Sequence, residues 1–166
     1  MLSLINSYAG GDMGQDDRGL EEAAVRVLLS HMGEDPDRDG LKDTPGRVVR
    51  AWTELTAGYR EDPAQILSRT FDEQSNEMVV LSNIQFYSTC EHHLLPFMGE
   101  ASVAYLPEQR VVGISKLARL VNCFARRLQV QERMTRQIAD AMNEHLQARG
   151  VGVIVKAHHL CMGCRG

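Results

Sequence analysis

Apolar side chains recur along the chain with two different periods, and the change of period divides the chain into segments. From Leu20 they recur every three to four residues, which predicts an amphipathic helix that ends near Gly33. A second helix is predicted to begin at Thr44, a hydroxyl N-cap followed by Pro45, and to stop at Gly58. The first part of the chain is therefore expected to be helical.

The remainder of the chain alternates between predicted strands and predicted helices. Ser115 is expected to cap one helix, whose apolar stripe extends to Leu128, and a second helix runs from about Met134 until Gly150 ends it. Stretches rich in β-branched and aromatic residues predict four strands, at 77–88, 100–105, 110–114 and 151–157. This order predicts an α+β fold: a mostly antiparallel four-stranded sheet with two long antiparallel helices, preceded by N-terminal helices.

Polarity along the chain predicts one domain with a short extension. Residues 1–18 are polar and rich in Gly and Asp, so we expect a flexible N-terminal arm. Residues 19–166 are expected to form a single domain, with a helical part at 19–70 and a strand-bearing part at 71–166. With 166 residues, 43% of them apolar, the chain is long enough to bury a core, and 24% charged residues argue against disorder.

Composition also narrows the environment in which the protein works. No apolar run reaches the length of a membrane span, and the first residues lack the features of a secretory signal. We therefore expect a cytoplasmic protein without a membrane partner. Its four cysteines are then expected to be reduced, and to serve a metal or catalysis before disulfides.

Charge is distributed unevenly along the chain. The net charge of −4 argues against nucleic-acid binding. Residues 1–43 hold ten acids and four bases, whereas residues 115–136 hold six bases and one acid. The basic stretch is either a solvated helix face or a place where a small polyanion binds.

The segment around residue 90 contains the residue types that bind transition metals. Cys90 and His93 have a Cys-x-x-His spacing, which lets one turn of chain supply two ligands to one ion, and thiolate with imidazole favours zinc. Cys161 and Cys164 offer further thiolates. One of them would complete a three-ligand site with a position open for water, whereas both would close a structural Cys₃His site.

Two more histidines stand beside these candidate ligands. His92 precedes one of them directly, and His159 lies two residues before Cys161. A structural zinc site does not need additional imidazoles, whereas a hydrolytic site needs groups that carry protons at neutral pH. The two spare histidines therefore favour a catalytic metal site over a structural one.

The two helices predicted after Gly113 carry possible substrate contacts. The start of the first helix presents Ser115, Lys116 and, one turn later, Arg119, and a helix N-terminus with such residues can bind phosphate. Glu132 is either plain helix surface or a carboxylate that accepts two N–H bonds from a guanine-type ring edge. Neither signal identifies a substrate by itself.

Four motifs in this order resemble those of the GTP cyclohydrolase I family. They are Cys-Glu-His-His at 90–93, Gly-Ile-Ser-Lys at 113–116, Arg-Leu-Gln-Val-Gln-Glu-Arg at 127–133 and His-Leu-Cys-Met-x-x-Arg-Gly at 159–166. The resemblance runs from about Leu20 to Gly166. It implies the tunnelling fold (T-fold) and one zinc ion per subunit.

The resemblance also implies a role for individual residues. Cys90, His93 and Cys161 match the zinc ligands, and His92 and His159 match the catalytic imidazoles. Glu132, with Gln131 beside it, matches the anchor for the guanine ring. The residues that match triphosphate contacts are Ser115, Lys116, Arg119, Arg165 and, from a neighbouring subunit, Arg47.

The activity that the resemblance implies is the zinc-dependent hydrolytic opening of the guanine imidazole ring of GTP. The reaction releases formate and gives 7,8-dihydroneopterin triphosphate, at the first step of folate and pterin biosynthesis. Family members are cooperative homo-oligomers, typically decamers with sites at subunit interfaces. The resemblance further implies that this chain stops before the family's last C-terminal segment.

Two other functions are compatible with parts of this pattern. A zinc closed by four protein ligands would indicate a catalytically silent nucleotide-binding or assembly protein. A related T-fold enzyme, such as a nitrile reductase, would use a cysteine nucleophile and a nicotinamide cofactor, and the Cys-Glu-His-His cluster argues against it.

Overall fold

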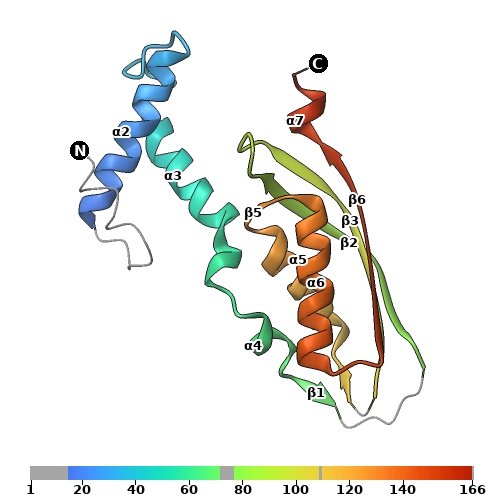
Figure 1. Cartoon of the computed structure of the whole chain (residues 1–166). Coiled ribbons are helices and arrows are strands. Elements are labelled where there is room, and N and C mark those ends of the chain that lie inside the picture. Colours follow the sequence, from blue (N-terminus) through green and yellow to red (C-terminus); the bar gives the residue numbers. More distant parts are fainter. Residues whose placement is uncertain (1–14, 72–76, 109, 166) are drawn as a thin grey trace. The chain divides into compact units, whose positions relative to one another are not determined.

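The computed structural model describes residues 15–71, 77–108 and 110–165 (Figure 1). The chain divides into two compact units, residues 1–53 and 54–166. The division falls earlier than the predicted boundary after residue 70. The reason is that the short elements between residues 57 and 71 pack against helices and strands of the second unit.

The first unit consists of helix α2 (Gln15–His31) and most of helix α3 (Thr44–Leu55). α2 begins inside the predicted flexible arm, whose residues 1–14 lie outside the described residues. Gly33 follows α2 with a φ of 89°, the left-handed conformation that glycine adopts without strain, and it confirms the predicted helix end. α3 begins at Thr44 as predicted but ends at Leu55, before Gly58.

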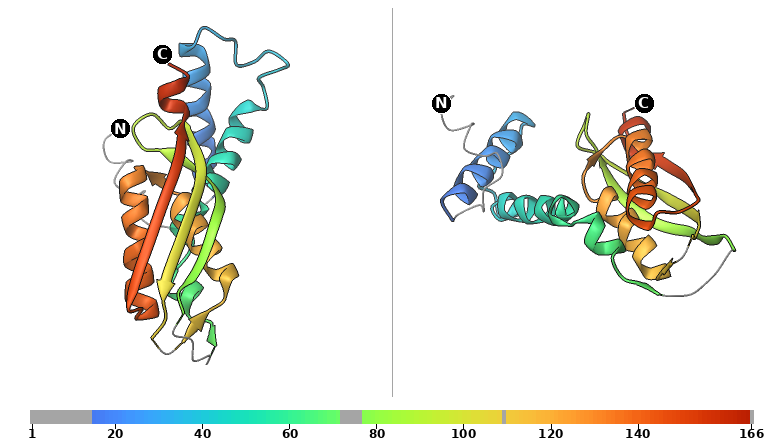
Figure 2. Two further views of the ribbon diagram at one scale, coloured as in Figure 1. Left: turned by 90° about the vertical axis from the view of Figure 1, so that its right-hand side faces the viewer. Right: turned by 60° about the horizontal axis from the view of Figure 1, so that its bottom comes forward.

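The second unit holds a four-stranded sheet with its helices gathered on one face (Figures 1 and 2). The strand order is β5-β2-β3-β6; β2, β3 and β6 pair antiparallel, and β5 runs parallel to β2. Its elements in chain order are η2 (Ala57–Arg60), α4 (Pro63–Leu67), β1 (Thr70–Phe71), β2 (Val79–Cys90), β3 (Pro96–Leu106), β4 (Val111–Val112), α5 (Ile114–Ala125), β5 (Leu128–Gln129), α6 (Gln131–Leu146), β6 (Gly150–His159) and α7 (Leu160–Gly163).

The α+β T-fold prediction is confirmed, but one of its four strands was wrongly assigned. The predicted strand at 110–114 is extended only at Val111–Val112, and it pairs with β1 outside the main sheet. The fourth place in the sheet belongs to β5, which the apolar periodicity assigned to a helix. α5 ends before β5 because the backbone of η2 approaches its last turn, where the Gly58 N–H donates to the Arg126 carbonyl over 3.0 Å.

Two predicted helix boundaries are also wrong. The N-cap of α5 is Gly113, and Ser115 lies exposed within the first turn. α6 ends at Leu146, and the left-handed residue that turns the chain is Gln147, with a φ of 49°, instead of Gly150. In both places the helix boundary lies two or three residues before the residue that sequence preference favours.

The core lies between the sheet and helices α5 and α6. Phe86 and Phe97, on neighbouring strands, meet edge to face with ring centroids 6.0 Å apart. Other side chains with at most 1% of their surface exposed include Val103, Tyr105, Leu117, Leu120, Val121, Met134, Ile138 and Met142. Burying each such side chain contributes about 1.5–3 kcal/mol. On the other face of the sheet Tyr87 and Ile154 are more than half exposed.

The direction of the strands gives the second unit two distinct ends (Figure 1, and the left view of Figure 2). The α7 end holds the turn from β2 to β3, the end of β6 and α7. The β1 end holds β1, β4 and the start of α5, where the Val112 N–H donates to the Tyr105 hydroxyl over 2.9 Å. Tyr105 lies eight positions after Phe97 on β3, a distance of about 26 Å in an extended strand.

No helix within the described residues is long and apolar enough to cross a membrane.

Candidate metal centre

A tight turn joins β2 to β3 at the α7 end and presents the first two candidate ligands. The Cys90 N–H donates to the Leu95 carbonyl over 2.8 Å, and the Leu94 N–H donates to the Cys90 carbonyl over 2.9 Å. Leu94 adopts a φ of 55°, a left-handed conformation that lets the chain reverse within these few residues. The turn leaves Cys90 buried and His93 exposed, on neighbouring sides of one small volume.

The structure brings Cys90, His93 and Cys161 together although the last is distant in sequence. Their ligand atoms all lie within 4.8 Å of one another, and 3.9 Å separates Cys90 Sγ from His93 Nδ1. Cys161 reaches this position because β6 pairs with β3 with His159 opposite Phe97, so α7 begins beside the turn. Two sulfurs and one imidazole nitrogen fit zinc, with a coordination position left open.

Burial and the neighbouring Cys90 thiol make the Cys161 thiol harder to ionise. Burial, followed by the hydrogen bond and charge of Cys90, raises the pKa of the Cys161 thiol. Two thiols this close ionise together only when a positive charge stabilises both thiolates, which a bound metal ion does.

Cys164 does not belong to the three-member group found among the described residues. It is exposed, and it follows α7 as its C-cap, with its N–H donating to the Leu160 carbonyl. The geometry therefore favours Cys161 over Cys164 as the third sulfur, and it favours the open site over the Cys₃His alternative.

The two spare imidazoles flank the cluster in different surroundings. His92 is exposed, with Nδ1 3.9 Å from Cys90 Sγ and its ring centroid 6.3 Å from that of His93. His159 is half-buried, and its ring stacks on Phe97 with centroids 4.8 Å apart and planes 7° from parallel. One imidazole is therefore open to a ligand from solvent, and the other is held by its neighbours.

Gln131 fixes the orientation of His159. Its amide nitrogen donates to the Val155 carbonyl over 3.1 Å, so its amide oxygen faces His159 Nε2 at 2.8 Å. An amide oxygen only accepts hydrogen bonds, so this network assigns the proton to Nε2 of His159. The predicted guanine contact is thus engaged with a catalytic candidate, which sequence reasoning did not anticipate.

Glu132 is exposed beside Gln131 in the first turn of α6, and Arg165 is exposed just after α7. Because the neighbouring Gln131 bonds to Val155 and His159 of β6, Glu132 lies at the α7 end, as does Arg165, which follows α7. Arg133, next along α6, forms an ion pair with Glu91 of the Cys-Glu-His-His turn. Sequence reasoning assigned no role to this pair, although an acid inside the Cys-Glu-His-His motif and a base inside the 127–133 motif were visible in the sequence.

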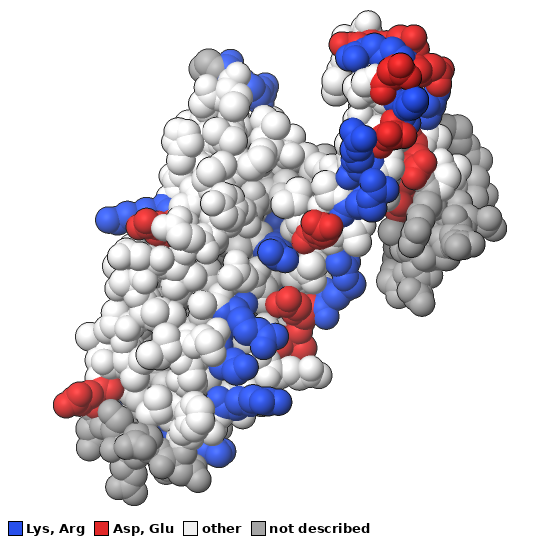
Figure 3. Space-filling model, turned by 180° about the vertical axis from the view of Figure 1, so that it is seen from behind, with Lys and Arg blue, Asp and Glu red and all other residues white. Residues whose placement is uncertain are grey.

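The predicted phosphate contacts on α5 lie elsewhere. Lys116 and Arg119 line a hollow of ≈ 460 Å³ together with Arg60 and Arg69, two cations that sequence reasoning missed. Acidic residues share this lining, and Figure 3 shows Lys and Arg side chains with a few acidic neighbours along one flank of the larger body. Ser115 and Lys116 begin α5 at the β1 end, so within one chain they do not converge with the metal cluster.

Arg47, the last predicted phosphate contact, lies on α3 in the first unit. Its side chain is exposed and pairs with Asp43 over 3.3 Å, one helical turn earlier. Such a pair between exposed side chains contributes little to stability, so the guanidinium can exchange this partner for a stronger anion at small cost.

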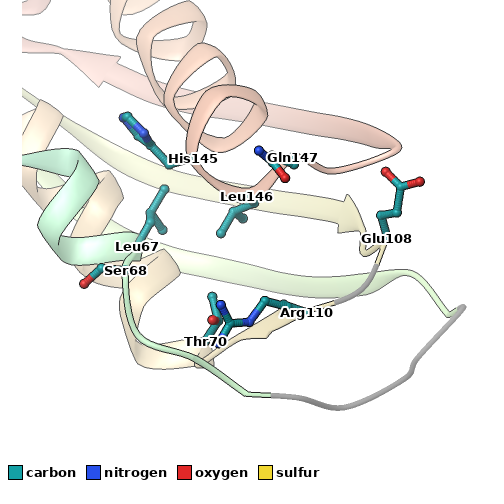
Figure 4. A pocket seen from close by; sticks show the side chains of 8 residues that line it. All are labelled: Leu67, Ser68, Thr70, Glu108, Arg110, His145, Leu146 and Gln147. Carbon is teal, nitrogen blue, oxygen red and sulfur yellow. The ribbon is translucent and has the colours of Figure 1, made fainter.

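A second cavity, of ≈ 320 Å³, opens at the β1 end (Figure 4). Its lining comes from the end of α4, β1, the segment before β4 and the end of α6: Leu67, Ser68, Thr70, Glu108, Arg110, His145, Leu146 and Gln147. It shares no residue with the metal cluster.

Comparison with known proteins agrees with the geometry of the α7 end. The family model described as GTP cyclohydrolase I matches residues 21–166. The protein named GTP cyclohydrolase 1 from Wolinella succinogenes is 53% identical over 153 residues, which cover 92% of this chain and 82% of that protein. The one from Mycobacteroides abscessus is 57% identical over 90% of this chain and 74% of its own length. The chain belongs to the GTP cyclohydrolase I family.

Proposed function

We propose that this chain opens the imidazole ring of GTP by hydrolysis, with the group Cys90, His93 and Cys161 as its zinc site. The observation that carries the proposal is this three-donor cluster flanked by two further imidazoles at one end of the sheet. Membership of the GTP cyclohydrolase I family gives the substrate and the reaction. The net reaction consumes one water and yields formate and 7,8-dihydroneopterin triphosphate.

The three donors would hold one zinc ion per subunit. When bound, zinc at such a three-ligand site acts as a Lewis acid and makes water a stronger nucleophile at neutral pH. Cys90 is 6% exposed, and the buried sulfur gives one face of the site a low dielectric, which strengthens electrostatic interactions there.

The proposed proton carriers are His92 and His159. As water attacks C8 of guanine, His92 would donate a proton to N7, because it is exposed at the mouth of the cluster. His159, with its Nε2 proton held by Gln131, would present Nδ1 as an acceptor for protons released when the ring and the ribose open. A second addition of water at C8 releases formate, and the ribose carbons then reclose the ring with loss of water.

Binding of GTP is assigned to both ends of the unit. Glu132 would accept the guanine N1–H and amino hydrogens, with Gln131 beside it, and Arg165 would contact phosphate at the same end. Ser115, Lys116 and Arg119 would contact the triphosphate from a neighbouring chain, because they lie on a helix that begins about 26 Å from the metal end. Arg47 would contribute from a neighbouring chain as well.

This division of contacts supports a homo-oligomer with sites at subunit interfaces, and we propose the decamer of the family. We further propose that the enzyme acts in the cytoplasm at the first step of folate and pterin biosynthesis, with a cooperative response to GTP. An oligomer built from interface sites lets occupancy of one site change its neighbours.

The test is turnover of GTP by zinc-loaded protein. The expected products are formate and, after oxidation, fluorescent neopterin triphosphate, with one zinc per chain. Absence of both products from an assembled, zinc-replete sample would refute the proposal. Four protein ligands on the metal, seen by X-ray absorption, would instead support the silent assembly protein.

A further inference from the structure

Glu91 is the residue of the Cys-Glu-His-His turn to which the proposed chemistry gives no role. Its carboxylate pairs with the guanidinium of Arg133 on the first turn of α6, through both carboxylate oxygens. The contact with Oε1 measures 3.4 Å from Arg133 Nη1. Both side chains are partly exposed, at 31% and 44%. The contact joins the turn that carries two candidate metal ligands to the helix that carries the candidate guanine anchor.

Arg133 also bonds to β5. Its Nε donates to Gln129 Oε1 and its Nη2 to the Leu128 carbonyl, each over 3.3 Å. The guanidinium is planar and rigid, so contacts from several of its nitrogens fix its position in three directions. One side chain therefore ties together the metal-ligand turn, β5 and α6.

The bonds of Gln129 continue this network into the core. Gln129 is 1% exposed, and its amide nitrogen donates to the Phe124 carbonyl and to Gln137 Oε1, each over 2.9 Å. Its carbonyl accepts the Glu91 N–H over 3.1 Å. A buried amide that is hydrogen-bonded in this way is held rigidly. Gln129 therefore fixes the orientation of Arg133 relative to the core.

The two halves of the proposed site meet at this pair. On one side, the turn carries Cys90, His92 and His93. On the other, the first turn of α6 carries Gln131, which bonds to His159, and Glu132. An error of about 1 Å between reacting groups costs on the order of 100-fold in rate, so the alignment of these two elements matters for catalysis.

We propose that the Glu91–Arg133 pair is a positioning element, which sets the first turn of α6 against the metal-ligand turn and thereby aligns the guanine ring with His92 and the metal. This inference rests on the proposed function. Neither residue contacts the reacting atoms in it; both act through the elements that they hold. An exposed ion pair by itself adds little to stability, so the pair is expected to affect rate more than folding.

The first experiment is a double-mutant cycle with Glu91→Gln, Arg133→Gln and the double variant, compared with Arg136→Gln as a control one turn along the same helix. Each single variant is expected to lower kcat/KM for GTP by about 10–100-fold, mostly in kcat, with zinc content unchanged. The double variant is expected to lose no more than the worse single variant, because one unit is broken in all three. The proposal would be overturned if the losses in kcat/KM of the two single variants multiplied in the double variant. It would also be overturned if each single variant had the same kcat/KM as Arg136→Gln.

The second experiment does not depend on activity or on metal. Amide hydrogen exchange of the metal-free protein is expected to become about tenfold faster in both the 91–95 turn and the start of α6 in each single variant, and not in Arg136→Gln. Unchanged exchange would contradict the link between the two elements. If the wild-type protein failed to convert GTP while the exchange changed as expected, the proposed function would fail and the structural link would remain.

Discussion

The two ends of the second unit are built from similar residue types but differ in how those residues are held. At the α7 end, Gln129 of β5 bonds to Gln137 of α6, and His159 of β6 bonds to Gln131 of α6. Three candidate metal donors also lie within 4.8 Å of one another there. At the β1 end, Lys116 and Arg119 line an open hollow of ≈ 460 Å³ in which cations and acids are mixed. One end is organised by a single chain, whereas the other presents charge towards solvent.

The difference follows from the chemistry that each end is proposed to carry. Zinc ligands and proton carriers must be placed before the substrate arrives, because misplacement directly lowers the rate. A flexible triphosphate needs positive charge more than fixed geometry, so partly or fully exposed side chains such as Lys116 and Arg119 suffice. The comparison implies that substitutions can impair zinc binding at one end and triphosphate binding at the other independently. Two chains with different substitutions can then restore activity when they assemble together.

The largest expected effect is at the α7 end. Cys161→Ser removes one of three close donors, so zinc content should fall to near zero and activity by more than about 1,000-fold. Cys164→Ser, the matched control on the same short segment, should keep both within about threefold because its thiol lies outside the group. Metal analysis and GTP turnover distinguish the two; the reverse result would make Cys164 the ligand.

The next largest effect is expected in the pairing of β3 with β6, the strand that leads into α7. Gly99 on β3 faces β6 so closely that an added Cβ would lie 1.9 Å from the Lys156 carbonyl oxygen. Gly99→Ala should therefore force the strands apart, cost about 3 kcal/mol or more and lower zinc affinity.

Gly152→Ala is the control for this change, in the same pair of strands but with its nearest atom at 3.9 Å. It should leave both stability and zinc binding close to those of the parent. Chemical denaturation and zinc titration measure both effects. Equal stability of the two variants would show that the sheet tolerates a shift at the α7 end.

A smaller effect is expected at the β1 end. Arg119→Gln should raise KM for GTP by about 10–100-fold and leave zinc content unchanged, because it removes one charge from the phosphate. Arg126→Gln, one residue beyond the same helix, is the control and should leave KM unchanged.

Oligomers assembled from two different variant chains test whether the two ends of one site come from different chains. Oligomers reassembled from equal amounts of Arg119→Gln and Cys161→Ser chains should recover about a quarter of the parent's activity, because a quarter of interface sites then combine two intact ends. Recovery no greater than the sum of the separate variants would mean that both ends serve the site of their own chain.

The smallest effect should be confined to stability. Tyr105→Phe removes the acceptor of the Val112 N–H and should cost about 1 kcal/mol without loss of zinc. Burial raises the pKa of Tyr105, outweighing the opposing hydrogen bond from Val112. The native state thus keeps the phenol proton when the unfolded chain loses it, so this contribution is present below pH of about 10 and declines above it.

Thermal unfolding of both proteins measured from neutral to alkaline pH gives the check. The difference in melting temperature between the parent and Tyr105→Phe should narrow above pH of about 10. A difference that stayed constant or widened would mean that Tyr105 does not contribute through its proton.

The sequence predicted much of the α7 end because its ligands are local motifs. Cys90 and His93 lie within one turn, and the segment around Cys161 contains further Cys and His residues. The spacing of these residue types alone therefore indicated a metal site. The packing partners were not predictable in this way. The Glu91–Arg133 pair and the Gln131–His159 bond join residues at least 28 positions apart, and only the register of β6 and the start of α6 brings them together.

The β1 end was predicted less well, for a different reason. Val111 and Val112 have strong strand preference, but Gly113 and the helix that follows leave room for only two paired residues. β5 is equally short, and its pairing depends on where the end of α5 meets Gly58. Two-residue strands are determined by tertiary contacts, which a pattern of apolar residues does not encode.

The placement of the three donors has a mechanical consequence. A metal ion held by Cys90, His93 and Cys161 would act as a cross-link that closes a loop of about 70 residues, much as a disulfide does. α7 has four residues, too few to be stable as an isolated helix. Anchorage of α7 is then coupled to metal occupancy, so a chelator would release this segment before the sheet itself begins to unfold.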